Sequence, residues 1–286
     1  MNLPAEQGAA ATAAASERLA SLLGERQRPF VLTGAGLSTE SGIPDYRDAA
    51  GGWKRRPPIQ YREFLHNDHA RRRYWARSMV GWQHVRAAHP NGGHHGFARL
   101  ERGGRLHWLV TQNVDGLHQR AGSRRVTDLH GRLDVVACLE CGHRMAREHL
   151  QDELLRRNPG WDRKTPEAAP DGDVDIESAD FDAFYVPDCP CCGGMLKPEV
   201  VFFGESVPAQ PVATAFTRLE EADLLLVAGS SLMVWSGYRF VRHAARIGIP
   251  VVVLNLGRTR GDREATVKLE APCGDTLTAV ADALGV

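Results

Sequence analysis

Short apolar runs recur along the chain, and polar side chains follow each of them directly. The clearest runs cover residues 28–33, 106–111, 223–228 and 249–255, and helix-like sequence lies near each one. A short helix is also expected from about Ser16 to Leu23, ended by Gly24. Strands that are apolar throughout are buried on both faces, and their alternation with helices is typical of a parallel, doubly wound sheet. We therefore predict an α/β fold.

Two stretches depart from this alternation. Residues 53–94 are rich in Arg, Trp and Tyr and are interpreted as a helical module, whereas residues 136–198 hold five of the six cysteines. We predict that these two stretches together form a smaller domain. Residues 1–52, 95–135 and 199–286 then form the doubly wound domain, and 286 residues suffice for two unequal domains.

A glycine turn follows the first apolar run. Thr33-Gly34-Ala35-Gly36-Leu37-Ser38 should open a helix, and backbone N–H groups at such a turn can bind a pyrophosphate. The third glycine of the dinucleotide fingerprint is missing, so the turn alone is as typical of a tight connection as of a nucleotide site. Rigid, polar and cationic residues come shortly after it: Ile43, Pro44, Asp45, Tyr46 and Arg47.

The other apolar runs also end in polar residues. These are Gln112, Asn113 and Asp115 after the second run, Gly229, Ser230 and Ser231 after the third, and Asn255, Leu256 and Gly257 after the fourth. Ligand crevices of open α/β sheets lie at the carboxyl ends of the strands. Polar ends on all four strands therefore predict a dinucleotide crevice along one edge of the sheet.

Two cysteine pairs share one spacing. Cys138 and Cys141 are separated by two residues and followed by glycine, and Cys189 and Cys192 repeat this pattern, which favours Cys192 over Cys191. Four thiolates close a tetrahedral zinc shell, so we predict a structural zinc ion. Disulfides are the alternative.

The overall composition narrows the class of protein. Net formal charge is zero, which gives no reason to expect nucleic acid or an anionic membrane as a partner. No run approaches the roughly 20 apolar residues of a membrane span. The alanine-rich start, residues 1–16, carries Glu6 and no basic residue, unlike a targeting segment. We therefore expect a cytoplasmic protein with reduced cysteines.

His130 is singled out among twelve histidines because it lies between the predicted sheet and the first cysteine pair. This places it near the seam between the two predicted domains, where binding sites gather. A surface or hydrogen-bonded core histidine is the alternative interpretation.

Taken together, these motifs resemble those of the sirtuins, and of their class II branch, over about residues 28–276. The resemblance rests on the glycine turn with Ser38 and Ser41–Arg47, on residues 111–115, on Leu129-His130-Gly131, on the cysteine pairs, on residues 197–205, and on the polar ends at 229–231 and 255–257. It implies a Rossmann-like domain with a zinc ribbon and a helical module. The implied activity is NAD-dependent protein-lysine deacylation, which cleaves nicotinamide from NAD and transfers the acyl group to ADP-ribose.

The resemblance also implies roles for individual residues. The phosphates would be held by Gly34, Ala35, Gly36 and Ser38. The nicotinamide carboxamide would be held by Asp115 and residues 43–45, and the ribose by Gln112 and Asn113. The adenosine half would be held by Gly229, Ser230, Ser231, Asn255, Leu256, Gly257 and the backbone at Cys273. Tyr46 and Arg47 would close the reactive end, with Asn113 and His130 catalytic. His130 matches the general base that takes a sugar hydroxyl proton.

Acyl-lysine proteins are the implied partners. Their backbone would lie between two segments as an added strand: Val201, Phe202, Phe203, Gly204 and Glu205 on one side, Leu232 and Val234 on the other. Preferred acyl chain and oligomeric state are left open.

Three other functions compete with deacylation. Protein ADP-ribosyl transfer shares nicotinamide cleavage and differs in the acceptor. A non-catalytic module would sense NAD, with a zinc ribbon that binds protein or nucleic acid. A hydride-transferring dehydrogenase is weaker, because no residue set suits a substrate redox step.

An acidic insertion departs from the family pattern at residues 161–187. Asp171, Asp173 and Asp175 suggest a calcium loop, but Ile176 replaces its glycine and Asp182 its glutamate. A solvated loop is the simpler interpretation, and a loop that selects acyl groups is the sharper one.

Overall fold

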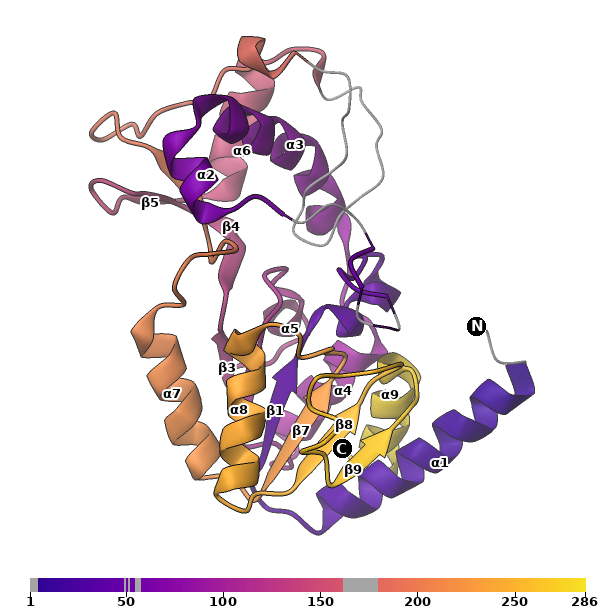
Figure 1. The fold of residues 1–286 in the computed structure, drawn as a ribbon. Coiled ribbons are helices and arrows are strands. Elements are labelled where there is room, and N and C mark those ends of the chain that lie inside the picture. Colours follow the sequence, from indigo (N-terminus) through magenta and orange to yellow (C-terminus); the bar gives the residue numbers. More distant parts are fainter. Residues whose placement is uncertain (1–4, 49, 51, 55–57, 162–179) are drawn as a thin grey trace.

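The computed structural model describes residues 5–48, 50, 52–54, 58–161 and 180–286. Its largest sheet has six parallel strands in the order β3-β2-β1-β7-β8-β9. The strands are β1 (Pro29–Thr33), β2 (Trp108–Thr111), β3 (Val126–Asp128), β7 (Leu224–Ala228), β8 (Val251–Leu254) and β9 (Val267–Leu269). The order reverses between β1 and β7, which is the switch point of a doubly wound sheet. The predicted fold class is confirmed (Figure 1).

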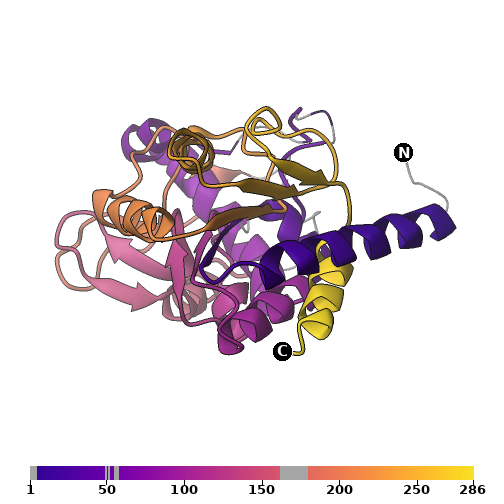
Figure 2. The ribbon, with the colours of Figure 1, turned by 90° about the horizontal axis from the view of Figure 1, so that it is seen from below.

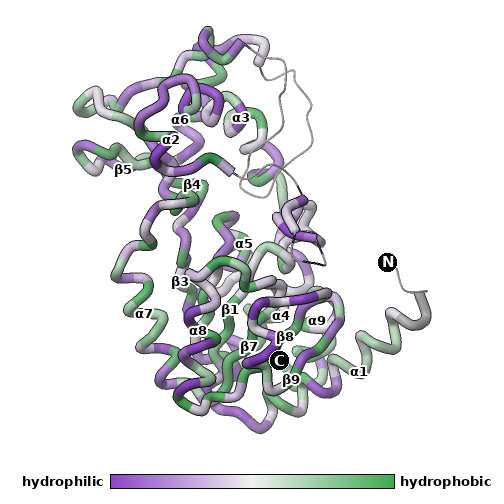
Figure 3. The backbone as a smooth tube through the Cα atoms, in the orientation of Figure 1, coloured by the Kyte–Doolittle hydropathy of each residue, from purple (hydrophilic) through white to green (hydrophobic). Residues whose placement is uncertain are grey.

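Helices cover both faces of this sheet. One layer contains α1 (Ala5–Gly24), α4 (Gly92–Arg102) and α9 (Cys273–Ala283), and the other contains α7 (Ala209–Glu220) and α8 (Trp235–Arg246). Apolar residues follow the central strands between the layers (Figure 3). α1 packs across α9 (Figure 2). It begins well before the expected Ser16, because alanine is the strongest helix former.

A second unit is built around a three-stranded antiparallel sheet in the order β5-β4-β6. Its strands are β4 (Gly131–Cys138), β5 (Arg144–Ala146) and β6 (Leu196–Val200), and its helices are α2 (Tyr61–His66), α3 (Asp68–Ala87) and α6 (Arg147–Arg157). These elements share an apolar core of their own, which includes Phe64, Trp75 and Phe184. β4, β6 and α4 run across the predicted domain limits at 135/136, 198/199 and 94/95, and the division remains a prediction.

The remaining helical elements are short. They are α5 (Leu117–Arg120) and the 3₁₀ helices η1 (Ala35–Leu37), η2 (Thr39–Ser41) and η4 (Phe181–Ala183). The expectation that the glycine turn opens a helix is wrong, since only two three-residue 3₁₀ helices follow it. The cause is a contact with a distant segment, because Gly36 N–H donates to Gly229 O at 2.8 Å, outside any helix, and Pro44 follows closely.

Strand register brings the polar strand ends together. Thr33 pairs with both Thr111 and Ala228, and Ala228 pairs with Leu254. The residues after these positions therefore meet at one edge of the sheet. Within the described part of the chain, no helix combines the length and apolarity that a membrane span needs. The calcium-like residues 171–176 and most of the acidic insertion lie outside the described residues.

Candidate active site

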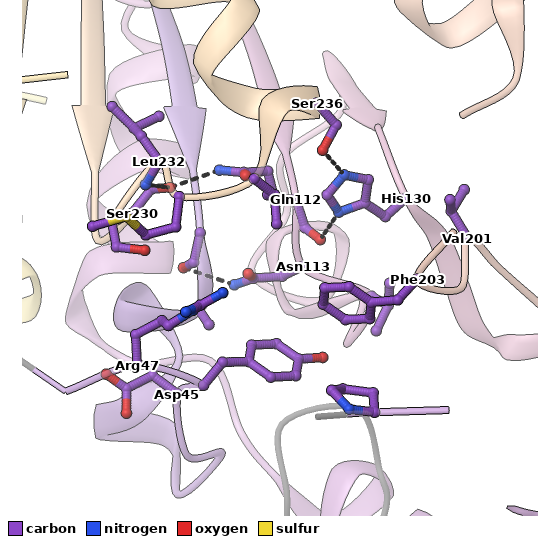
Figure 4. Close-up of a pocket in the computed structure, with 18 of the residues that line it drawn as sticks. Asp45, Arg47, Gln112, Asn113, His130, Val201, Phe203, Ser230, Leu232 and Ser236 are labelled. Atoms are coloured by element: carbon purple, nitrogen blue, oxygen red, sulfur yellow. Dashed lines mark hydrogen bonds between the residues drawn. The ribbon is translucent and has the colours of Figure 1, made fainter. Parts of the chain in front are cut away.

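A cavity of about 730 Å³ opens at the carboxyl ends of β1, β2, β7 and β8 and reaches the second unit (Figure 4). Its size is that of a site for a small molecule or cofactor. The lining includes most of the residues singled out from the sequence: Gly34, Ala35, Gly36, Ser38, Ile43, Asp45, Tyr46, Arg47, Gln112, Asn113, Asp115, His130, Val201, Phe202, Phe203, Gly204, Glu205, Gly229, Ser230, Ser231, Leu232, Val234, Asn255 and Leu256.

The glycines of the first turn permit a close approach between two loops. A Cβ atom at Gly34 would lie 2.7 Å from Ser230 Cβ, and one at Gly36 would lie 2.9 Å from Gly229 O. Neither position accepts a side chain without movement of the loop that follows β7. The glycines therefore allow the first turn to pack closely against the loop after β7, and both loops line the cavity.

A buried chain of hydrogen bonds fixes the polar residues after β2. Asn113 Nδ2 donates to Gly34 O at 3.1 Å and to Ser38 Oγ at 3.0 Å, and Ser38 Oγ donates to Asp115 Oδ2 at 2.7 Å. Leu117 N–H donates to the other carboxylate oxygen at 2.9 Å. Burial raises the pKa of Asp115, and the bonds from Leu117 and Ser38 oppose that rise. A carboxylate held this way can accept from an amide of a bound ligand.

The neighbouring loop is held by Gln112. Its Nε2 donates to Ser230 Oγ at 2.8 Å and to Thr33 O at 3.2 Å. Leu232, which follows Ser230, has a φ of 58°, the one positive φ outside glycine in the described residues. A left-handed non-glycine residue costs on the order of 1 kcal/mol or more, and such strain collects at functional sites. This backbone is therefore held in shape by its surroundings.

His130 lies at the seam between the sheet and β4. Its Nδ1 is 2.9 Å from Gln112 O and its Nε2 is 2.8 Å from Ser236 Oγ (Figure 4). A carbonyl oxygen can only accept, so the neutral ring carries its proton on Nδ1 and presents a lone pair at Nε2. Burial lowers the pKa of His130 to about 4; the bond to Gln112 opposes this and the charge of Arg239 adds to it. The ring is thus a neutral base at physiological pH.

Aromatic side chains form the opposite wall. Tyr46 and Phe203 both make edge-on contacts with Trp53, at centroid distances of 6.2 and 5.6 Å, and the guanidinium of Arg47 lies 3.6 Å from the centre of the Trp53 ring. Asp45 forms an ion pair with Lys54. This wall joins residues 45–47 to the segment at 201–205.

That segment is anchored by an ion pair beneath it. Lys197 Nζ lies 3.0 Å from Glu205 Oε2, and Glu205 also accepts from Phe202 N–H at 2.8 Å. Lys197 is 5% exposed, so its charge is held in an apolar setting that includes the Phe202 ring. A buried pair is costly to break from one side, because the other charge is left unpaired.

Three predicted residues do not line the cavity: Pro44, Gly257 and Cys273. Cys273 is buried, with its Sγ 3.8 Å from Leu254 O. The cavity also includes residues that sequence reasoning missed: Asp48, Trp53, Pro58, Ile59, Tyr74, Val114, Val200, Ser206, Val207, Trp235, Ser236, Arg239 and Arg258. Five of them are apolar or aromatic residues of the helical module and β6 that look like core in sequence: Trp53, Pro58, Ile59, Tyr74 and Val200.

The cysteine pairs come together in the second unit. The Sγ atoms of Cys138, Cys141, Cys189 and Cys192 lie within 4.8 Å of one another, with 3.5 Å between Cys138 and Cys192 and 3.7 Å between Cys141 and Cys189. Tetrahedral zinc with Zn–S bonds of about 2.3 Å sets sulfur atoms about 3.8 Å apart, so the four thiols fit it. Cys191 lies outside this set. All six cysteines are free of disulfides.

Comparison with known proteins gives consistent results. Residues 34–236 match the model of the Sir2 family. An NAD-dependent protein deacetylase of Bordetella bronchiseptica is 55% identical over 92% of this chain and 96% of its own. The bovine mitochondrial protein lipoamidase sirtuin-4 is 49% identical over 88% of this chain and 81% of its own, which agrees with the class II branch. A solved Sir2 enzyme with p53 peptide and NAD+ has a TM-score of 0.73 at 28% identity, covering 94% of this chain and 98% of that one.

The doubly wound sheet, the polar crevice at its switch point and the four-thiol cluster define a class, the NAD-dependent protein deacetylases. Within that class, the chain belongs to the Sir2 family. Its reaction consumes NAD and a protein acyl-lysine, and its second unit has the ligands for one structural zinc ion.

Proposed function

We propose that the cavity of this NAD-dependent protein deacylase binds NAD along the sheet edge and that His130 is the general base of acyl transfer. The observation that carries the proposal is the pair of bonds on His130, because it leaves the lone pair of Nε2 as the basic site in a neutral ring. That site lies in the same cavity as Asn113 and Asp115. A positioned base of this kind contributes about 10²–10⁴-fold to a proton-transfer step.

Two polar groups suit the part of NAD that must be cleaved. Asp115 can accept from the nicotinamide carboxamide, and the buried amide of Asn113, fixed through Gly34 and Ser38, can hold the ribose. The N–H groups of Gly34, Gly36 and Gly229 already donate to backbone carbonyls, so the same two loops would offer those of Ala35, Ser230 and Ser231 to the phosphates. Ser231, Asn255 and Leu256 would then face the adenosine half, whereas the buried Cys273 would act through its backbone alone.

The acyl-lysine would reach the cavity between residues 201–205 and 232–234, with its backbone paired as an added strand. Val201 N–H donates to His130 O at 2.8 Å and Tyr61 N–H to Phe203 O at 2.8 Å, so this segment is held on the side facing the protein. Beyond it, Ile59, Val114 and Phe202 offer an apolar lining for an acyl chain.

Replacement of His130 by alanine tests the proposal. Deacylation of an acetyl-lysine peptide should fall at least about 100-fold, because the sugar hydroxyl loses its proton acceptor. Nicotinamide–NAD exchange with the same peptide should continue, since cleavage precedes that proton transfer. His95→Ala, at an exposed histidine outside the cavity, is the matched control. Undiminished deacylation by His130→Ala would disprove the role, and ADP-ribosyl transfer to protein as the main product would favour the competing activity.

A further inference from the structure

Two residues in the first turns of α8 (Trp235–Arg246) lie near His130. Ser236 Oγ is 2.8 Å from Nε2 of the imidazole, and Arg239, three residues later, donates from its Nε to Ser236 O at 3.0 Å. All three side chains line the cavity. The turn is pressed against the loop after β2, because a Cβ atom at Gly237 would lie 2.4 Å from Gln112 Oε1. α8 thus has little freedom to move away from the base.

Donor and acceptor roles at this contact are fixed by chemistry. Since Nδ1 donates to Gln112 O, Nε2 of the neutral ring can only accept, and the Ser236 hydroxyl must be the donor. The serine therefore occupies the same lone pair that a sugar hydroxyl must reach. Arg239 adds a positive charge beside it, and its Nη2 is buried with no hydrogen-bond partner among the described residues.

We propose that Ser236 and Arg239 are positioning residues for deacylation, which hold the lone pair of His130 Nε2 free of a proton until a sugar hydroxyl replaces the serine. This inference rests on the proposed role of His130 as base. In the step itself, which follows attachment of the acyl oxygen to the ribose, the sugar O–H bond breaks and its proton passes to Nε2. The electron pair of the sugar oxygen forms the bond to the acyl carbon, while the π bond between that carbon and the lysine nitrogen breaks and its electron pair passes to the nitrogen. Ser236 then regains the site when the imidazole returns to its neutral form.

Both residues act in the same direction on the base. A donor to the lone pair stabilises the neutral ring, and a nearby positive charge destabilises the protonated one. Burial is the largest cause of the low pKa of His130, and the charge of Arg239 lowers it further. The other charged groups nearby are engaged elsewhere: Asp115 with Ser38 and Leu117, Asp128 with Gln119, Glu205 with Lys197, and Asp45 with Lys54.

The pH profile of deacylation distinguishes this role from simple packing. With acetyl-lysine peptide and NAD, the natural enzyme should keep its acyl-transfer rate down to a pH near 5. In Ser236→Ala, the pH at which the rate falls on the acidic side of the profile should rise by about half to one unit, which corresponds to the free energy of one hydrogen bond. Arg239→Gln should move it in the same direction, and the double variant further. Ser236→Thr and Arg239→Lys, which keep the hydroxyl and the charge, should restore the profile.

Nicotinamide–NAD exchange is the internal reference, because it precedes proton transfer to His130. It should stay within about threefold in Ser236→Ala, with circular dichroism confirming the fold at each pH. An acidic limb that does not move, or equal losses in both reactions at every pH for Ser236→Ala and Ser236→Thr, would overturn the inference. Retained deacylation in His130→Ala would instead overturn the proposed function, so the two failures are distinguishable.

Discussion

The backbone N–H of Val201 donates to the carbonyl oxygen of His130 at 2.8 Å. This bond joins the segment proposed to pair with the substrate backbone to the residue proposed to act as base. The bond continues the pairing of β4 with β6, in which Gly131 lies opposite Val200, so residues 201–205 are joined directly to the backbone of the proposed base. The segment proposed to bind the substrate and the residue proposed to accept the proton are thus held by the same hydrogen bond, although they come from distant parts of the chain.

Val201→Pro tests this contact, because proline has no N–H to donate. The lost bond and the orphaned His130 carbonyl should cost about 1–2 kcal/mol, so kcat/KM for an acetyl-lysine peptide should fall by roughly tenfold or more. Val201→Ala keeps the N–H and should stay within about threefold. The measurement is peptide deacylation with NAD saturating. Equal activity in the two variants would show that the bond is dispensable.

Asp115 offers a prediction in which stability and activity change in opposite directions. Burial raises the pKa of its carboxyl above that of the unfolded chain, so the folded state favours the protonated form. Stability from this group is present below the unfolded pKa and lost as pH rises through the folded value. Asp115→Asn should therefore raise the melting temperature at neutral pH, and its advantage should shrink as pH falls.

The same variant should lose nicotinamide exchange by at least about tenfold, because the amide is a weaker acceptor for the carboxamide. Asp134→Asn, at a carboxylate bonded to Arg132 outside the cavity, is the control. Thermal unfolding between about pH 5 and 8 measures the change in stability, and exchange kinetics measure the change in activity. A variant that is less stable at neutral pH would contradict the sign of this argument.

The sequence was most informative where one local rule determines the structure. Apolar runs identified the four inner strands because a strand buried on both faces has no polar face. Parallel register then placed the residues after them together, so the polar strand ends were predictable as a group. The cysteine pairs were equally readable, since two-residue spacing is set by metal geometry.

Other features depended on contacts between distant segments. The glycine turn failed to open a helix because Gly36 bonds to Gly229, nearly 200 residues later in the chain. Ile59 and Tyr74 line the cavity from the second unit, but nothing in an apolar residue indicates whether it faces a core or a ligand. Ser236 was missed because its partner, His130, lies 106 residues away in sequence.

The zinc cluster gives a prediction with a built-in control. Cys192→Ala should abolish zinc binding and lower the melting temperature, because the second unit loses one of four ligands. Cys191→Ala, one residue earlier and outside the cluster, should keep one equivalent of zinc and its melting temperature within about 2 °C. Zinc content by mass spectrometry and thermal unfolding provide the measurements. If Cys191→Ala loses zinc and Cys192→Ala keeps it, Cys191 is the fourth ligand and Cys192 is not.

A final prediction concerns a buried charge that does not line the cavity. Arg147 is 1% exposed, lies between Trp75 and Trp82, and forms no ion pair among the described residues. Its Nη2 reaches Ser78 O at 3.3 Å, whereas its Nη1 has no hydrogen-bond partner in the part of the chain that the structure describes. Burial lowers the pKa of this guanidinium to about 10. The two ring contacts contribute about 1 kcal/mol each, less than the several kcal/mol that burial of an unpaired ion costs.

Arg147→Met removes the charge and fills a similar volume, so it should raise the free energy of unfolding by about 1 kcal/mol. Arg147→Ala also removes the charge but leaves a cavity, which costs about 2–5 kcal/mol for a large buried side chain and outweighs the gain. Urea unfolding of the two variants and of the natural protein measures whether each substitution raises or lowers the free energy of unfolding. The rate of peptide deacylation should stay within about threefold for Arg147→Met. If Arg147→Met proves less stable than the natural chain, the two indole contacts and the Ser78 bonds outweigh the desolvation of this arginine.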